Sequence, residues 1–320
     1  IMRAERDGSV SHGLFRLPAY VAGLKSKKIN GKARPELENV APSIIKVLGN
    51  NAVAPMVLSL GLPAVIDLAK NGHVVTSKQA LRLNQFKKII KDVNSEESLY
   101  TQNYKEGDTL KNVALANTLI RISKNGRKEF YEGETARTMV DYLDSKNGII
   151  TLKDFKAYEA IWREPIVFNY KDLKIISMSP PSSGGICLAQ ILKLIEPYPI
   201  KDYGHNTAKT IQLITEAERR AYADRSFYLG DPDFIKIPSK KLISTDYLKG
   251  RMEQFSFEKA TDSESLSYGS IPSFESSETT HYSIVDPYGN AIAVTTTLNG
   301  AYGSKLYVNQ LGFFLNNEMD

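Results

Sequence analysis

The stretch from Thr279 to Asn299 most constrains what this chain can fold into. Two runs rich in β-branched residues, 279–285 and 291–297, flank the turn-forming sequence Asp-Pro-Tyr-Gly-Asn. The pattern predicts an antiparallel β-hairpin. Because the two ends of such a pairing meet, we expect the hydroxyl groups of Thr279 and Thr297 to lie at the same end of the hairpin.

The same stretch carries a recognisable motif. The residues TTHYSIVDPYGNAIAVTTTLN, followed by LNNEMD at 315–320, resemble the start of the small subunit of the γ-glutamyltranspeptidases, which are N-terminal-nucleophile hydrolases. Members of that family are made as precursors that cut themselves before the first Thr of the motif. The resemblance therefore implies that Glu278 and Thr279 form the processing site and that Thr279 is the catalytic nucleophile.

Cleavage at that bond explains how a threonine can act as a nucleophile. A hydroxyl reacts poorly until a base accepts its proton. Breaking the Glu278–Thr279 bond frees an α-amino group, whose pKa is ordinarily about 7.7–8.0, and this amine can take the proton directly or through water. One cut thus produces the nucleophile and its base together. Outside such a motif, Thr279 would be an ordinary strand residue, because threonine is common in strands.

Three segments upstream of the hairpin resemble the same family. They are the run Leu62–Gly72, the sequence PPSSGGI at 180–186 and the block EAERRAYADRS at 216–226. In the second, serines can cap a helix and glycines permit close backbone approach. In the third, charges spaced three and four residues apart support a helix. We interpret the second segment as supporting the site and the third as structural.

The hydrophobic pattern predicts mainly helices before the hairpin. The expected elements are two helical pieces within 36–72 broken near Gly49, a helix capped by Thr76 or Ser77, helices at 115–126, 136–143, 151–158 and 207–227, and strands at 166–168 and 173–178. The single tryptophan, Trp162, and the single cysteine, Cys187, are expected in the core.

The motifs divide the chain into two regions. Residues 1–278 are expected to be large-subunit-like, with 1–35 the least readable part, and residues 279–320 to begin a small-subunit-like region that carries the nucleophile. Residues 256–278 are rich in Ser and Glu, a composition typical of flexible linkers, and flexibility before Thr279 would suit self-cleavage. The resemblance implies an α+β fold, the four-layer αββα sandwich of N-terminal-nucleophile hydrolases, incomplete here at both ends.

The resemblance also implies roles for three further residues. Thr297 corresponds to a second catalytic threonine, which hydrogen-bonds the nucleophile. Asn299 and Glu318 correspond to residues that bind the α-amino and α-carboxylate ends of a glutamyl group; a carboxylate suits an ammonium, whereas an amide can serve either partner. The family's DFRE segment has no clear counterpart here, and its PLSSM and GSPGG segments do not occur before Asp320. We therefore do not expect these 320 residues alone to be a competent enzyme.

The implied activity is that of a γ-glutamyltransferase or glutathione hydrolase. Its partners would be glutathione or other γ-glutamyl compounds, amino acid or peptide acceptors, and the two subunits cut from one precursor. No metal or organic cofactor is expected. Two alternatives stay open: a cephalosporin-acylase-like amidase and a non-catalytic binding or scaffold relative.

Composition argues against several other classes of protein. The net charge of +5 comes without the basic-aromatic pattern of nucleic-acid readers, and no apolar run is long enough to span a membrane. One cysteine excludes an internal disulfide, and the four histidines lack metal-ligand spacing. No signal-peptide pattern opens the chain, so a periplasmic or extracellular location is implied by the family resemblance only.

Overall fold

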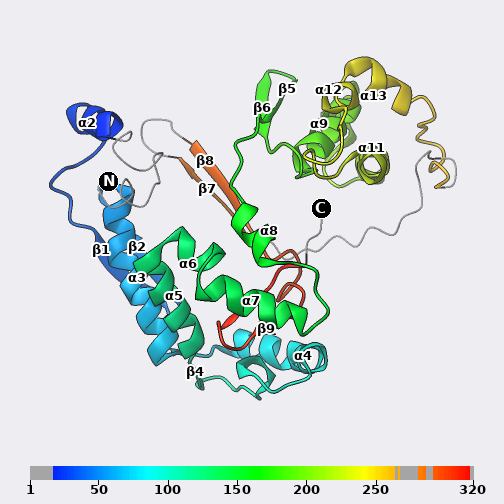
Figure 1. Ribbon diagram of the computed structural model, residues 1–320. Coiled ribbons are helices and arrows are strands. Elements are labelled where there is room, and N and C mark those ends of the chain that lie inside the picture. Colours follow the sequence, from blue (N-terminus) through cyan, green and yellow to red (C-terminus); the bar gives the residue numbers. More distant parts are fainter. Residues whose placement is uncertain (1–16, 264–265, 267–279, 286–290, 318–320) are drawn as a thin grey trace. The chain divides into compact units, whose positions relative to one another are not determined.

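The computed structural model describes residues 17–263, 266, 280–285 and 291–317 of the chain (Figure 1). Contacts divide the chain into two compact units, one formed by 1–159 with 276–318 and the other by 160–275 with 319–320. In the described ranges, helices are accompanied by five two-stranded antiparallel sheets. The α+β content expected from the sequence is therefore present.

The first unit begins with α2 (Leu17–Lys25) and a hairpin of β1 (Glu36–Ala41) and β2 (Ile44–Leu48). The helix predicted for the start of 36–72 is wrong here. Burial alternates residue by residue along β2, and a short apolar run of β-branched residues fits such a strand as well as it fits a helix. The second helical piece is present as α3 (Ala54–Asn71), which contains Pro63.

Four further helices of this unit lie where local signals predict them: α4 (Ser77–Asn94), α5 (Val113–Asn125), α7 (Glu134–Asp144) and α8 (Leu152–Ala157). The short helix α6 (Arg127–Tyr131) was not predicted. The Thr76 hydroxyl accepts a hydrogen bond from the Gln79 N–H and caps α4. Gly126 ends α5, and Thr151 and Asp154 form the capping box of α8.

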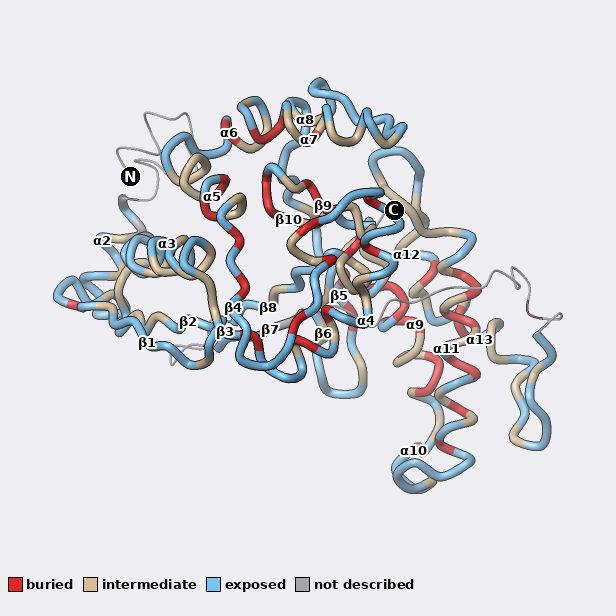
Figure 2. The backbone as a smooth tube through the Cα atoms, turned by 90° about the horizontal axis from the view of Figure 1, so that it is seen from below, coloured by how far each residue is buried: buried red, intermediate tan, exposed pale blue. Residues whose placement is uncertain are grey.

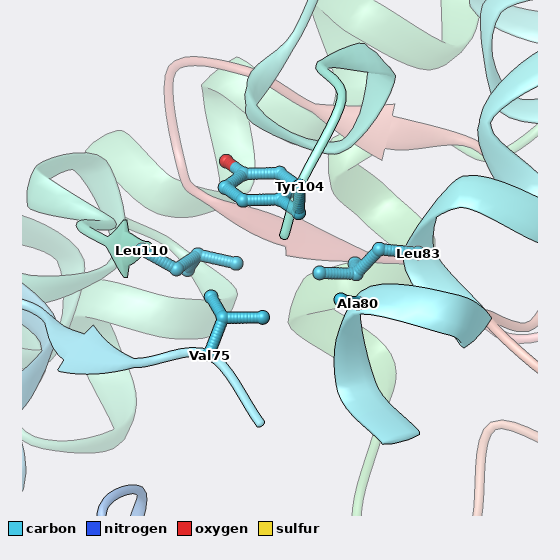
Figure 3. Close-up of a cluster of buried hydrophobic side chains, with 5 residues drawn as sticks. All are labelled: Val75, Ala80, Leu83, Tyr104 and Leu110. Carbon is cyan, nitrogen blue, oxygen red and sulfur yellow. The ribbon is translucent and has the colours of Figure 1, made fainter. Parts of the chain in front are cut away.

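A buried apolar cluster holds α4 against a short sheet of β3 (His73–Val74) and β4 (Thr109–Leu110). Figure 3 shows its side chains converging from α4, from β4 and from the segments beside them. The cluster consists of Val75, Ala80, Leu83, Tyr104 and Leu110. Tyr100, in the short 3₁₀ helix η3 (Leu99–Thr101), and Tyr302 pack against it. The C-terminal segment is thereby part of the same core.

Buried polar side chains of the helices fix the backbone of residues 305–312. The Asn94 amide donates to the Lys305 carbonyl at 2.8 Å and accepts from the Tyr307 N–H at 2.9 Å. The Asn112 amide donates to the Gly312 carbonyl at 2.7 Å, and the Thr118 hydroxyl to the Leu311 carbonyl at 3.0 Å. These bonds hold the short strands β9 (Tyr307–Val308) and β10 (Phe313–Phe314) against α4 and α5.

The second unit packs a hairpin and two longer helices around its own core. The hairpin pairs β5 (Ile166–Tyr170) with β6 (Leu173–Ser177), and the helices are α9 (Gly184–Ile195) and α11 (Ala208–Tyr228). The buried residues of α9 and α11 are red in Figure 2. Shorter helices complete the unit: α10 (Ile200–Tyr203), α12 (Ser239–Leu242) and α13 (Thr245–Arg251).

Two single residues test the expected core of this unit. Cys187 is buried in α9, as predicted. Trp162 was expected in the core and is 98% exposed, so that prediction is wrong. It lies in an irregular segment before β5, where no periodic pattern directs a side chain inward, and size alone does not bury a tryptophan.

Candidate active site

The predicted hairpin is present as β7 (Thr280–Val285) paired with β8 (Ala291–Thr296) (Figure 1). The strands are antiparallel, and the register runs from Thr280 opposite Thr296 to Val285 opposite Ala291. The sequence expectation for this stretch is therefore confirmed for both strands. The connecting turn, 286–290, lies outside the described residues.

A turn directly after β8 joins two of the expected site residues. The backbone N–H of Asn299 donates a hydrogen bond of 2.8 Å to the Oγ1 of Thr297. Asn299 has a φ of 71°, in the left-handed region that asparagine tolerates better than most residues. The Thr297 hydroxyl and the Asn299 backbone thus form one local unit at the open end of the hairpin.

The segment that ends in Asn317 lies beside this turn. The N–H of Gly300 donates to the Oδ1 of Asn317 at 2.8 Å, and the N–H of Asn317 donates to the Leu298 carbonyl at 3.3 Å. A Cβ at Gly303 would stand 2.1 Å from the Leu315 carbonyl oxygen, so only glycine permits this backbone approach. The two loops are held together mainly by backbone contacts.

An aromatic cluster supports the same loops. The Tyr100 ring lies 6.0 Å from that of Tyr302, 4.9 Å from that of Tyr307 and 4.7 Å from that of Phe314, measured between ring centroids. Burial raises the pKa of Tyr100 to about 12, so its phenol stays neutral at physiological pH. We interpret the cluster as packing that positions the loops.

The expected site residues fall into two groups. Thr297 and Asn299 are described and lie together. Glu278, Thr279 and Glu318 lie outside the described residues, as does most of the expected linker at 256–278. In the ranges that the structure does describe, no three His, Cys, Asp or Glu side chains gather closely enough to hold a metal ion.

The hydrogen bond between Gly300 and Asn317 was not predicted from the sequence. Apart from their place in the LNNEMD motif, Asn316 and Asn317 have the composition of an ordinary loop. Their separation from Gly300 in the sequence gives no local signal for the hydrogen bond between Gly300 and Asn317. The membership of Asn317 in the motif was the one available hint.

Two family models match the chain. The model described as Gamma-glutamyltranspeptidase matches residues 57–320, and the model described as Malate/L-lactate dehydrogenase matches residues 1–78. The first match includes the hairpin, the turn and the Asn317 segment. It does not include residues 1–56, whose likeness is to the second model.

Known proteins point to the same family. The chain is 39% identical to the glutathione hydrolase proenzyme of Escherichia coli (strain K12) over 269 residues, which is 83% of this chain and 46% of that protein. The crystal structure of Helicobacter pylori γ-glutamyltranspeptidase matches 65% of this chain and 61% of its own, with 37% identity and a TM-score of 0.60. The chain spans about half the length of the curated relatives it matches.

A likeness of fold extends further. The crystal structure of cephalosporin acylase from Bacillus halodurans matches 92% of this chain and 55% of its own, with a TM-score of 0.65. Its identity is 20%, so this match informs on the fold and not on the chemistry. Among the described residues, no helix is both long enough and apolar enough to cross a membrane.

Proposed function

Because the chain belongs to the gamma-glutamyltranspeptidase family, we propose that it acts as a self-processing γ-glutamyltransferase and glutathione hydrolase with Thr279 as its nucleophile. One observation carries the assignment of the site. The described strands end with Thr280 opposite Thr296, and Thr297 follows in a turn that fixes its hydroxyl to the Asn299 backbone. Thr279 precedes the first residue of that pair and Thr297 follows the second, so the same register favours a contact between them.

The first reaction would cut the chain. The Oγ of Thr279 attacks the carbonyl carbon of Glu278, the C–N bond breaks and the nitrogen gains a proton, which leaves an ester and a free α-amine. Water then attacks the ester carbonyl. This step releases a new carboxyl group on Glu278 and restores the Thr279 hydroxyl beside its own amine.

The second reaction would use the same oxygen on a substrate. The α-amine of Thr279 takes the hydroxyl proton as Oγ attacks the γ-carbonyl of glutathione or another γ-glutamyl compound. The leaving amine gains a proton, and a γ-glutamyl ester remains on Thr279. Water resolves this ester in hydrolysis, and the amine of an amino acid or peptide resolves it in transfer.

Three other residues receive roles in this proposal. Thr297 donates or accepts a hydrogen bond at the nucleophilic oxygen. Glu318 binds the substrate ammonium, which its negative charge suits, and Asn299 binds the α-carboxylate or the ammonium through its amide. The Asn317 contact with Gly300 supports this arrangement because it holds the Asn299 turn beside the segment that leads to Glu318.

The architecture expected from the family is part of the proposal. Residues 1–278 would belong to a large subunit and 279–320 to the start of a small one, within a four-layer αββα sandwich. The likeness of fold to solved family members supports this layering. A periplasmic or extracellular location would follow from the same family membership.

Intact mass and N-terminal sequencing of the purified full-length protein test the proposal. We expect two fragments, one of which starts Thr-Thr-His-Tyr-Ser. Thr279→Ala should stay uncut because it lacks the hydroxyl, whereas Thr279→Ser should still be cut because it keeps one. A Thr279→Ala chain that is cut at the same bond would refute the assignment of the nucleophile.

The acylase-like alternative rests on the likeness of fold to cephalosporin acylase. The two activities are separated by substrate. A γ-glutamyl anilide should be turned over by the processed full-length protein if the proposal is right. Cleavage of a cephalosporin side-chain amide without cleavage of the anilide would favour the alternative, and a chain that never processes would favour a non-catalytic relative.

A further inference from the structure

A cavity of about 670 Å³ lies in the second unit, among residues that the proposed function does not use. It is bordered by the C-terminal end of α9, by α13 and by Asn169 of β5. Its volume falls within the range of small-molecule sites, which is roughly 300–1,000 Å³.

The lining of the cavity is apolar in part. Leu194 and Leu248 are buried members of one hydrophobic cluster, and Met252 and Tyr198 pack against it. The cavity therefore borders the core of this unit. Met252 and Tyr198 are only partly buried, so a ligand with an apolar body would remove their remaining apolar surface from water, which is favourable.

Part of the lining is suited to a positive charge. Glu196 and Glu253 both line the cavity, and the Lys171 N–H holds the Glu196 carboxylate in place. The carbonyl of Lys193, in the last turn of α9, lacks its helical donor because residue 197 is a proline and has no N–H. Carboxylates and helix C-terminal carbonyls attract an ammonium group.

The cavity also presents positive charges. Lys193 and Lys249 line it, and the Lys193 ammonium is fixed by a hydrogen bond of 2.8 Å to the Ile243 carbonyl. Lys249 and Glu253 are four residues apart, yet they form no ion pair in the described part of the chain. The exposed side chains of Lys249 and Glu253 are therefore available to a ligand that carries groups of the opposite charge.

From these features we propose that the cavity binds a short zwitterionic peptide with apolar side chains. Its ammonium end lies toward Glu196 and the end of α9, its carboxylate lies toward Lys249, and its side chains cover Met252 and Tyr198. A peptide capped at both ends has neither the ammonium nor the carboxylate, so it contacts only the apolar part of the lining. The proposal concerns a second site, independent of the proposed chemistry at Thr279.

Calorimetric titration with leucyl-leucine tests this site. The full chain is used with Thr279→Ala, so that neither processing nor acyl transfer interferes, and the outcome does not depend on the proposed function. Leucyl-leucine should saturate one site. N-acetyl-leucyl-leucine amide, which lacks both charges, should bind about tenfold more weakly, since each exposed charge contact contributes up to about fivefold.

Matched variants locate the site. Lys249→Ala and Glu196→Ala should each weaken binding about three- to fivefold, whereas Lys259→Ala and Glu258→Ala, exposed and outside the cavity, should leave it unchanged. Thr245→Trp, an exposed position on the cavity wall, should abolish binding with an unaltered circular dichroism spectrum. Equal binding of the free and capped peptides, no saturation, or equal losses in the Lys249 and Lys259 variants would overturn the proposal.

Discussion

Glu216 and Arg220 show how single residues of the EAERRAYADRS block stabilise its helix. Both side chains are buried and form an ion pair in α11. The Glu216 carboxylate also accepts from the Arg219 guanidinium at 2.7 Å and from the Thr261 N–H at 3.1 Å. Burial alone would raise the pKa of Glu216, but the hydrogen bonds from Thr261 and Arg220 outweigh it and hold the pKa below the usual value of 4.5. These contacts support a structural role for the block.

Replacing Glu216 tests this network through its pH dependence. A lowered folded pKa stabilises the fold above pH 4.5, and this contribution is lost as the pH falls through the folded pKa. Glu216→Gln should lower the free energy of unfolding by about 3–5 kcal/mol at pH 7, because Arg220 stays buried without its partner, and the difference should shrink below pH 4.5. Urea unfolding over a pH series measures it. Glu218→Gln, an exposed neighbour, should change little; a Glu216→Gln difference independent of pH would contradict the pairing.

Thr297 is the residue on which the proposed chemistry depends after Thr279. Thr297→Val removes the oxygen that accepts the Asn299 N–H, and Thr297→Ser keeps it. We expect the valine variant to lose about 10- to 100-fold in kcat with little change in KM. The lost contact would be the hydrogen bond from Thr297 to the Thr279 oxygen as that oxygen gives up its proton, and one hydrogen bond to a charged group contributes about 1.5–3 kcal/mol. Turnover of a γ-glutamyl anilide by the processed full-length protein measures this. Unchanged activity in Thr297→Val would remove Thr297 from the site.

At the scale of elements, the PPSSGG segment joins three parts of the second unit. The Arg225 guanidinium of α11 donates to the Ser183 hydroxyl at 2.9 Å, just before α9 begins. Within α9, a Cβ at Gly185 would stand 2.0 Å from the carbonyl oxygen of Met178, which follows β6. The glycine is therefore required for α9 to pack closely against the end of the hairpin.

A pair of glycine variants tests this packing. Gly185→Ala should lower the free energy of unfolding by about 1–3 kcal/mol or more, because the atom it meets belongs to the backbone and cannot rotate away. Gly250→Ala in α13 meets nothing within 4 Å and should raise stability by about 0.5–1 kcal/mol. Thermal and urea unfolding compare the two. Equal effects would show that the close approach at Gly185 is not needed.

At the scale of the whole molecule, the chain resembles two families, and the two matches overlap from α3 to the start of α4. The two family matches overlap at residues 57–78, and α3 spans 54–71. The hairpin of β1 and β2 lies in the part that resembles the dehydrogenase model. The site residues and the second unit lie wholly in the part that resembles the gamma-glutamyltranspeptidase model.

The second unit should fold by itself. Its two apolar clusters draw all their members from residues 166–257, so its core is complete within 160–275. Residues 160–275 produced alone should show a helical circular dichroism spectrum and a cooperative urea transition. Leu213→Ala, in this core, should lower its stability by about 2–5 kcal/mol. A broad transition without cooperativity would contradict the independence of this core.

Local sequence determined most of the helices and the hairpin. Thr76, Gly126 and the Thr151–Asp154 pair end or begin helices through contacts within a few residues, and such contacts can be read from the order of side chains. The motif and the β-branched runs likewise indicated the β7–β8 pairing and the place of Thr297. The family itself could be inferred because its motifs are contiguous.

Tertiary structure decided what depends on residues far apart. Whether 36–48 became strand or helix, and whether Trp162 was covered, depended on which neighbours packed against them. Asn94 binds the Lys305 carbonyl and Asn112 that of Gly312 across roughly two hundred residues, so no local pattern predicts either bond. A buried amide gains its partner only when the chain folds back onto it, because the cost of desolvation is offset by a hydrogen bond that just the folded chain supplies.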